Sequence, residues 1–429
     1  YMKKKANNVL DQVLEQVNPD EKTVKEINSS LKAFLLKFNK RKKSLKIDAE
    51  IFVGGSFAKK TLIKKDNYDI DIFVRFNKKY ANDKISGLTK KMLVGIKKVS
   101  TIHGSRDYFR VQINSNVYFE LVPVMKVNNP KQSKNITDLS YSHVKYAEKK
   151  IKSKAILNDI KLAKAFCYAN QCYGAESYIK GFSGYSLELL VYHYGGFIKF
   201  IRAMSKITTK DKKVIDIEKL HRNRSSILMD INDSKLQSPV ILIDPTFKHR
   251  NVLAALSNET FRKFQKSCKK FLKIQSIKSF EIVKTDIGKI RTNALKKKFQ
   301  FILLEAKTGK QKGDIAGSKL LKFYNHLNED ISRFFKISNK GFNYNDKQAA
   351  RFFFVVSPKK EILLKGPELK DKSHLKAFKK AHKKTFNKGK RIYAREKISF
   401  SLKTFIGNWN KKNKKKIREM YIKGFKSLH

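Results

Sequence analysis

The alternation of hydrophobic and polar positions changes along the chain, and these changes mark the predicted elements. In residues 51–76, apolar runs flank Gly54-Gly55, which predicts a strand, a tight turn with a short helix, a loop and a second strand. Residues 7–40 repeat apolar side chains at helical spacing and break at Asn18-Pro19-Asp20, which predicts two helices over one face of that sheet. A helix over 85–98 and a hairpin of strands 108–113 and 117–124, turned at 114–116, are expected next. Together these elements predict an α/β module over residues 1–138.

Helical spacing dominates residues 139–275, the second expected domain. Helices are predicted at 142–150, 156–169, 184–204, 251–256 and 259–272, the last of them capped by Ser257 or Asn258. In the third domain, 276–429, strands over 299–306, 351–356 and 361–364 are expected to form a sheet beside a helix over 318–335. Basic segments follow at 374–390 and 411–416, with a predicted amphipathic helix up to Phe425. The fold class is therefore α+β and multidomain.

The charge of the chain points to a polyanionic partner. Lysine and arginine total 96 against 37 acidic residues, which gives a formal net charge of +59 spread over the whole length. Such a field attracts nucleic acid at close to diffusion-limited rates. The alternative is that part of the excess reflects lysine-rich codon usage. A hydrophobic content of 41% suits globular folding, and 429 residues exceed one ordinary core, so two or three domains are expected.

The cysteines and the apolar runs bear on where the protein works. Cys167, Cys172 and Cys268 have no zinc-ligand spacing and cannot pair evenly, so reduced, buried thiols are expected. No apolar run reaches the length of a transmembrane helix, and no signal peptide is visible. These features predict a cytoplasmic protein.

The stretch 51–76 carries the candidate chemistry. The two glycines let the backbone approach a ligand closely, and Ser56 is expected to cap the turn 57–61, so that free N–H groups face a triphosphate. Asp69 and Asp71 are two residues apart on a strand, which places both carboxylates on one face. Such a pair repels unless a cation lies between the two groups, and Mg²⁺ suits carboxylates together with phosphate oxygens. The alternative for either motif alone is a turn or a solvated strand face.

A third carboxylate completes this pattern. Gly-Gly-Ser followed by Asp-x-Asp resembles the nucleotidyltransferase superfamily of DNA polymerase β, in which a neighbouring strand supplies another acid. The strand 117–123 contains one acidic residue, Glu120.

Motifs in the helical region narrow the resemblance. The strings YGAE (173–176) and GFSGYSLELL (181–190) precede DP (244–245) and RNVLAAL (250–256). In this order the motifs closely resemble archaeal (class I) CCA-adding tRNA nucleotidyltransferases, with matching spacing over 51–257. The resemblance implies a polymerase-β-like head, a helical neck, an α/β body and a basic tail. It also implies untemplated addition of C, C and A to the 3′ end of tRNA from CTP and ATP, with Mg²⁺. The body and tail would hold the tRNA acceptor stem, and the oligomeric state stays open, with a homodimer as one alternative.

The resemblance also assigns roles to individual residues. Asp69, Asp71 and Glu120 match metal-binding carboxylates, whereas the family usually has Glu first and Asp third. Positions that match contacts to the phosphates or the base are Ser56, Lys59 (usually Arg), His143, Lys164, Tyr173 and Arg250. Residues 138–143 keep only the ends of the family motif around the histidine.

Simpler roles remain open for these side chains. His143 could be a surface histidine, Lys164 one lysine among many, and Tyr173 a packed aromatic. Arg250 could pair with Asp244 or Glu188 and support the neck.

Two rival functions remain. One is an untemplated poly(A)- or oligo(U)-adding polymerase, against which the YGAE and GFSGY motifs argue. The other is an RNA-binding protein with an inactive transferase domain, against which three intact carboxylates argue.

Overall fold

The computed structural model describes residues 2–208, 212–283, 285–344 and 347–428. The chain forms two compact units, residues 1–283 and 284–429. The first unit holds two large hydrophobic cores, one beneath a sheet and one among helices, and a smaller buried cluster that includes Ile241 and Ile243. No helix in the described ranges is long and apolar enough to cross a membrane.

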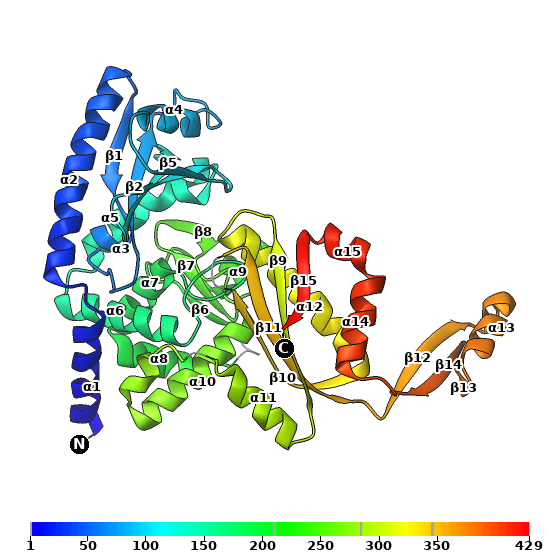
Figure 1. The fold of residues 1–429 in the computed structure, drawn as a ribbon. Helices are drawn as coiled ribbons and strands as arrows, with labels where there is room; N and C mark the ends of the chain where they lie inside the picture. Colours follow the sequence, from blue (N-terminus) through cyan, green and yellow to red (C-terminus); the bar gives the residue numbers. More distant parts are fainter. Residues whose placement is uncertain (1, 209–211, 284, 345–346, 429) are drawn as a thin grey trace. The chain divides into compact units, whose positions relative to one another are not determined.

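A five-stranded sheet forms the upper part of the first unit in Figure 1. Its order is β1-β2-β5-β4-β3, from β1 (Ala49–Val53), β2 (Tyr68–Phe76), β5 (Val117–Met125), β4 (Tyr108–Gln112) and β3 (Val99–Ile102). Strands β2 and β5 run parallel, and the other neighbours run antiparallel. The predicted pair of strands around Gly54-Gly55 and the predicted hairpin are both confirmed. Alternate residues of β4 and β5 face the core, as period-two alternation requires.

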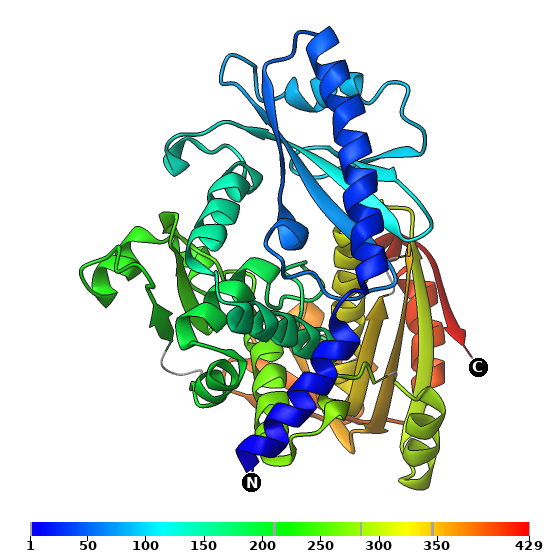
Figure 2. The same cartoon turned by 90° about the vertical axis from the view of Figure 1, so that its left-hand side faces the viewer.

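The two N-terminal helices serve different cores. Helices α1 (Met2–Val17) and α2 (Glu21–Ser44) break as predicted, and the Asp20 carboxylate caps α2 by accepting the Thr23 N–H at 2.7 Å. Helix α2 lies along the sheet (Figure 2). The prediction that both helices cover the sheet is wrong for α1, whose Leu10 and Val13 are buried in the helical core. The break redirects the chain, and the Lys161 side chain donates to the Asn18 carboxamide oxygen at 2.8 Å.

Glycines divide elements that look continuous in sequence. The helix expected over 184–204 is two helices, α7 (Gly184–Tyr194) and α8 (Phe197–Ser205). Gly195 and Gly196 between them adopt φ of 70° and 127°, which a residue with a Cβ rarely adopts. The expected helix over 85–98 is shorter for a similar reason: α4 (Ile85–Met92) ends before Gly95, whose φ is 85°.

The other helices of the second core follow the prediction more closely. They are α5 (Ser140–Lys150), α6 (Lys154–Ala169) and α10 (Asn258–Ile274), the last capped by Ser257. All three cysteines are free and buried, as expected.

A small sheet within this region was not predicted. Its strands are β6 (Lys213–Ile215), β7 (Val240–Asp244) and β8 (Phe247–Asn251), with the short helix α9 (Arg224–Asp230) beside them. The helix expected over 251–256 is wrong, because β8 ends at Asn251 and a turn follows. The Asn251 carboxamide oxygen accepts the Leu242 and Leu253 N–H groups at 3.0 and 2.9 Å, which stabilises the turn instead of a helix.

The second unit is built on a four-stranded sheet of order β10-β11-β9-β15. Strands β9 (Gln300–Thr308) and β11 (Ala349–Pro358) and helix α12 (Asp314–Phe334) are confirmed, whereas β10 (Phe335–Tyr344) was not predicted. Beyond α14 (Leu402–Lys412) and α15 (Lys414–Glu419), the expected helix up to Phe425 is instead strand β15 (Ile422–Leu428). Its Ile422 is buried, and its Phe425 ring lies 5.1 Å from that of Phe323, so packing against α12 overrides the helical pattern.

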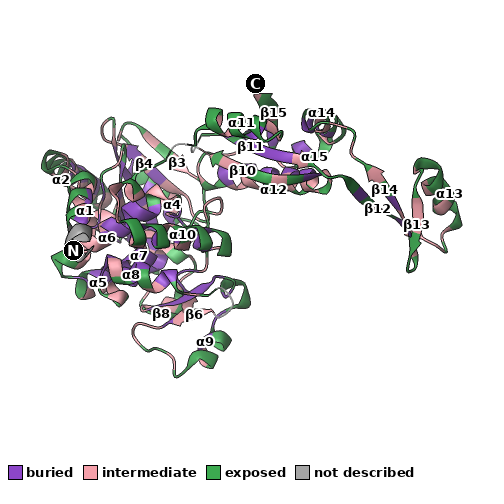
Figure 3. Cartoon of the chain, turned by 90° about the horizontal axis from the view of Figure 1, so that it is seen from below, coloured by how far each residue is buried: buried purple, intermediate pink, exposed green. Residues whose placement is uncertain are grey.

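The predicted basic segment 374–390 forms part of a second, three-stranded sheet. That sheet has the order β12-β14-β13, from β12 (Glu361–Glu368), β14 (Arg391–Lys397) and β13 (Thr385–Lys388). Helix α13 (Lys372–Ala381) precedes β13 and is largely exposed (Figure 3). Its lysines are therefore open to solvent.

Candidate active site

The three predicted carboxylates lie on one face of the sheet. Asp71 pairs in register with Glu120 across the parallel strands β2 and β5, and Asp69 is two residues earlier on β2. Ile70 and Ile72 between and after them are fully buried on the opposite face. The alternation read from the sequence therefore holds.

An arginine that the sequence reasoning missed joins two of these acids. Arg110 of β4 donates from Nη2 to Glu120 Oε1 at 2.6 Å and lies 3.5 Å from Asp69 Oδ1. The register of the hairpin places Arg110 directly opposite Glu120. Both residues are five positions from Ser115, so a hairpin centred there would have revealed the pair.

The electrostatics of Asp71 indicate a place for a cation. Burial raises the pKa of the Asp71 carboxyl to about 7, and the neighbouring charges of Glu120 and Asp69 add to this against the opposing charge of Lys59. Burial also raises the pKa of Glu120, with Arg110 opposing the shift. Within the described ranges no three ligand side chains already converge as a metal site. Arg110 supplies the positive charge that two of the carboxylates need.

The residues nevertheless fit a divalent cation in donor type and charge. Three carboxylates share the face, and oxygen ligands are those that Mg²⁺ prefers. Gly55 leaves room for Asp71: a Cβ at this glycine, whose φ is 61°, would lie 1.8 Å from Asp71 Oδ2. A side chain there would displace the carboxylate.

Residues 54–61 form the turn that is predicted to face a triphosphate, called the phosphate turn below. It differs from the prediction in one detail. Helix α3 (Gly55–Ala58) begins at Gly55 with Gly54 in the capping position, so Ser56 lies inside the helix and does not cap it. The left-handed φ of Gly55 explains the earlier start, because it turns the chain one residue sooner than a serine cap would. The Ser56 carbonyl accepts the Thr61 N–H at 2.9 Å and closes the turn.

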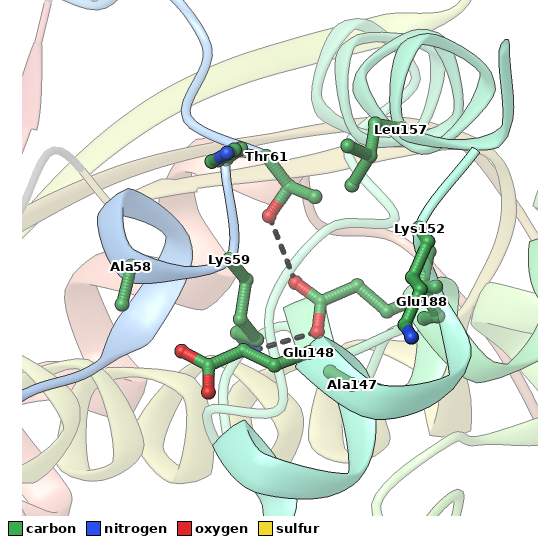
Figure 4. A pocket seen from close by; sticks show the side chains of 10 residues that line it. Ala58, Lys59, Thr61, Ala147, Glu148, Lys152, Leu157 and Glu188 are labelled. Atoms are coloured by element: carbon green, nitrogen blue, oxygen red, sulfur yellow. Dashed lines mark hydrogen bonds and ion pairs between the residues drawn. The ribbon is translucent and has the colours of Figure 1, made fainter. Parts of the chain in front are cut away.

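Two of the predicted phosphate-binding lysines meet at one buried acid, Glu188 of α7. Lys59 Nζ donates to Glu188 Oε2 at 2.6 Å, and Lys164 Nζ of α6 donates to Glu188 Oε1 at 2.9 Å. The Thr61 hydroxyl donates to the same Oε1 at 3.0 Å (Figure 4). Lys164 is only 2% exposed, so it is not one solvated lysine among many.

Charge pairing decides the protonation of this group. Burial alone would raise the pKa of Glu188, but Lys164 and Lys59 together lower it to about 2. Burial lowers the pKa of Lys164 to about 8, although Glu188 opposes the shift. The lowered pKa of Glu188 and the lowered pKa of Lys164 agree with the number of charged partners. Glu188 has two ammonium partners, whereas Lys164 shares its one carboxylate partner with Lys59. Glu188 is therefore ionised near neutral pH.

A second buried acid, Asp244 at the end of β7, gathers the other two predicted cations. His143 Nε2 of α5 lies 2.9 Å from Asp244 Oδ2, and Arg250 Nη1 of β8 donates to the same oxygen at 2.7 Å. Arg250 thus pairs with Asp244, one of the partners considered from the sequence. The Tyr185 hydroxyl donates to Asp244 Oδ1 at 3.3 Å, and its ring stacks on His143 with centroids 4.2 Å apart.

The protonation of this second group follows from the same balance. Burial lowers the pKa of His143, with Asp244 opposing the shift, so the imidazole is neutral at pH 7. Burial would raise the pKa of Asp244, but the hydrogen bond from His143 and the charge of Arg250 lower it. Arg250 therefore carries the positive charge of this group.

Tyr173 lies beside the lysine group. Its hydroxyl oxygen would be 3.1 Å from a Cβ at Gly184, and a Cβ there would also contact Lys164. The Lys65 ammonium lies 5.7 Å from the centre of the Tyr173 ring. The glycine at 184 thus permits Tyr173 and Lys164 to lie close together.

Sequence reasoning named Glu188 and Asp244 only as pairing partners of Arg250. A signal was present, because each is an acid within an apolar run, Leu187–Val191 and Val240–Asp244. An acid in such a run is buried and needs cationic partners. A cavity of about 390 Å³ adjoins Lys59, Thr61 and Glu188.

Comparisons with known proteins match both parts of the first unit. One family model, described as the Second Messenger Oligonucleotide or Dinucleotide Synthetase domain, matches residues 2–154. Another, described as the second domain of tRNA nucleotidyltransferase, matches residues 158–281. The first contains the three carboxylates, and the second contains Lys164, Glu188 and Asp244.

Curated relatives are CCA-adding enzymes from archaea. That of Nanoarchaeum equitans is 41% identical over 214 residues, which cover 49% of this chain and 52% of the relative. That of Methanocaldococcus jannaschii is 26% identical over 409 residues, which cover 92% of this chain and 88% of the relative. That of Archaeoglobus fulgidus is 27% identical over 277 residues, covering 65% and 58%. The chain therefore matches little more than half of the first and third relatives.

Solved structures support the fold. A structure of the RNA terminal uridylyl transferase Cid1 has a TM-score of 0.52 at 13% identity and covers 66% of this chain and 100% of that chain. Cid1 in complex with its short product ApU has a TM-score of 0.51 and covers 65% and 99%. At this identity the likeness shows a polymerase-β-like nucleotidyltransferase fold of mixed α and β content. Together with the two matched domains, the relatives show that this chain is similar to the archaeal CCA-adding enzymes, most extensively to that of Methanocaldococcus jannaschii among the three compared.

Proposed function

We propose that this protein adds C, C and A, without a nucleic-acid template, to the 3′ end of tRNA. CTP and ATP are the substrates and pyrophosphate is released. The observation that carries the proposal is the set of three carboxylates on β2 and β5, in the same compact unit as the cations gathered by Glu188 and Asp244. Residues 1–138 would form the catalytic head, 139–275 the neck, and 276–429 the body and tail that hold the acceptor stem, in the cytoplasm.

The reaction is an in-line displacement at the α-phosphorus. The tRNA 3′-hydroxyl oxygen forms the new P–O bond and loses its proton to solvent, and the bond to the β-phosphate oxygen breaks with its electron pair leaving on pyrophosphate. Asp69, Asp71 and Glu120 would hold Mg²⁺, which when bound activates the hydroxyl and stabilises the leaving oxygen. Arg110 would release Asp69 and Glu120 for that purpose. Lys59 and His143 would orient the triphosphate, with Ser56 and Tyr173 beside them, and the buried Lys164 would add its positive charge behind them.

The proposed function is tested by the products. A tRNA that ends at the discriminator base is incubated with CTP, with ATP and with both, and the added nucleotides are sequenced. Addition that stops after C, C and A supports the proposal. Continued addition of one nucleotide supports the untemplated-polymerase alternative, and no addition supports an RNA-binding protein.

Asp71→Ala should abolish this addition while tRNA binding stays within a few-fold of wild type. The change removes a carboxylate of the proposed metal site, whereas phosphate contacts hold the RNA. A loss of about 10³-fold or more in kcat is expected for a group required for transition-state charge stabilisation. Substantial addition by the variant with Mg²⁺ contradicts the assignment, and filter binding of tRNA is the control.

The affinity for CTP should fall as the pH rises through about 8. The pKa of Lys164 is about 8 because of burial, so this side chain loses its charge between pH 7 and 9. Burial raises the pKa of Tyr173 and Tyr185 and lowers that of His143, so these groups do not titrate in that window. Isothermal titration with CTP from pH 7 to 9.5 measures the effect. Lys164→Arg should flatten the profile, and an unchanged wild-type affinity across the window contradicts the role of Lys164.

Arg250 should select the base. C and A present an acceptor at N3 and N1, where U and G carry an N–H, and a guanidinium has only donors. Arg250→Ala should raise misincorporation of UTP relative to CTP by about 1–3 kcal/mol of lost discrimination. Lys248→Ala on the same strand, where Lys248 is half exposed, is the matched control. A uniform loss of activity with unchanged selectivity would leave Arg250 only as the partner of Asp244.

The lysines of α13 should contribute to the salt dependence of tRNA binding. Each phosphate contact changes the slope of log affinity against log salt by about 0.7–0.9. Replacing four exposed lysines of α13 by glutamine should therefore flatten the slope, measured by fluorescence anisotropy from 50 to 300 mM salt; the residues are Lys372, Lys376, Lys379 and Lys380. A matched set on α2 should leave it unchanged, namely Lys22, Lys25, Lys32 and Lys37. An equal loss of slope in both variants indicates a general charge effect and contradicts a specific role for α13.

A further inference from the structure

Glu188 lies where the sheet-containing and helical parts of the first unit meet. It belongs to α7, is 1% exposed, and contacts Lys59 and Thr61 from the turn after α3 as well as Lys164 from α6. In Figure 4 its carboxylate points toward Thr61 and Lys59, and dashed lines join it to both side chains. One side chain thus connects three segments that are distant in sequence.

The hydrogen bonds of Lys164 and Lys59 differ in how many N–H donors they leave available to a ligand. Lys164 has three N–H donors, and the structure gives it three acceptors: Thr61 Oγ1 at 2.6 Å, Glu188 Oε1 at 2.9 Å and the Thr61 carbonyl at 3.3 Å. Its donors are therefore fully used within the protein. Lys59 donates to Glu188 Oε2 at 2.6 Å through one N–H, and its side chain is 11% exposed. Lys59 can thus offer further donors to a phosphate.

The turn that carries Lys59 also contacts the Glu188 carboxylate through Thr61, at the other end of the turn. Thr61 is 1% exposed, and its N–H donates to the Ser56 carbonyl at 2.9 Å. Lys60, which lies between Lys59 and Thr61 in the chain, has a left-handed φ of 57°. The contacts of Lys59 and Thr61 with Glu188 lie on either side of Lys60 and hold both ends of the turn.

We propose that Glu188 is a positioning residue that holds the Lys59 ammonium toward the triphosphate of the incoming nucleotide, while Lys164 and Thr61 fix the carboxylate in place. This inference rests on the proposed function. Because the triphosphate is common to CTP and ATP, Glu188 acts equally on both nucleotides and not on the choice of base. Arg250 and Asp244, by contrast, form a separate group.

Steady-state kinetics of C addition and of A addition test the proposal in Glu188→Gln. The amide keeps the shape of the carboxylate but removes its charge, so KM for CTP and for ATP should each rise by about 10-fold, the scale of a lost hydrogen bond to a charged group, with kcat changed less. Glu148→Gln is the matched control, since Glu148 lines the same cavity and pairs with Lys145 at the surface. Its kinetic constants should equal those of wild type. Wild-type KM values in a folded Glu188→Gln protein overturn the proposal.

A double-mutant cycle separates positioning from general support of the fold. If Glu188 acts through Lys59, then Glu188→Gln added to Lys59→Met should raise KM no further than Lys59→Met alone. Independent, multiplicative effects overturn the proposal. If Glu188→Gln does not fold by circular dichroism, Thr61→Val provides the test, because it removes the hydroxyl contact without leaving a buried charge unpaired. The change also removes one of the three acceptors of Lys164, so both KM values should rise by about 10-fold, the scale of hydrogen bonds to charged groups, and wild-type values overturn the proposal.

Binding of inorganic tripolyphosphate distinguishes this inference from the proposed function. Isothermal titration of the full chain with tripolyphosphate requires neither tRNA nor catalysis. Weaker binding by Glu188→Gln than by wild type, together with failure of wild type to add C, C and A, would retain the role of Glu188 and refute the proposed function. Equal binding by both proteins, with wild-type addition of C, C and A, would refute the role of Glu188 alone.

Discussion

A buried carboxylate needs positive charge beside it, and much of the first unit is organised by this requirement. An ionised acid taken out of water costs several kcal/mol unless cations and hydrogen bonds replace its hydration. Glu188 and Asp244 meet the requirement with side chains from different segments, so charge pairing fixes α5, α6, α7, β8 and the phosphate turn relative to one another. Apolar contacts alone are non-directional and would not set these positions so narrowly.

The carboxylates on the sheet illustrate the opposite case. Asp71 lies among other acids, and burial together with the charges of Glu120 and Asp69 raises the pKa of its carboxyl to about 7. Arg110 compensates Glu120 and Asp69 but contributes no contact to Asp71 among its hydrogen bonds and ion pairs in the described structure. The protein therefore concentrates negative charge on this face and leaves it only partly neutralised. Such local imbalance is typical of sites that bind cations or charged ligands.

Several structural features that neighbouring residues determine were predicted correctly, whereas some features that depend on distant residues were not. Alternation along β2 placed Asp69 and Asp71 on one face, and the break at Asn18-Pro19-Asp20 was visible, because each follows from neighbouring residues. The predictions of one continuous helix over 184–204 and of a helix over 251–256 were wrong. The left-handed φ of Gly195 ended the first helix, and the hydrogen bond from the Leu242 N–H to the Asn251 side chain replaced the second. The pair of Arg110 and Glu120 follows from the predicted hairpin, whose turn at 114–116 is centred on Ser115, but was overlooked. Strand β15 depended on a partner far away in the chain, which no local pattern contains.

That long-range pairing also orders events during synthesis. In the second unit, β9 is bordered by β11 and β15, and the Thr308 hydroxyl donates to the Tyr421 carbonyl 113 residues later. The ribosome releases β9, with its apolar run Phe301–Leu304, well before β15, so one edge of this strand stays open while more than a quarter of the chain is made. Closing so long a loop is slow, and an open apolar edge invites pairing with other chains. The first unit is complete in sequence before β9 emerges, so this open edge is exposed only after the residues of the first unit have been made.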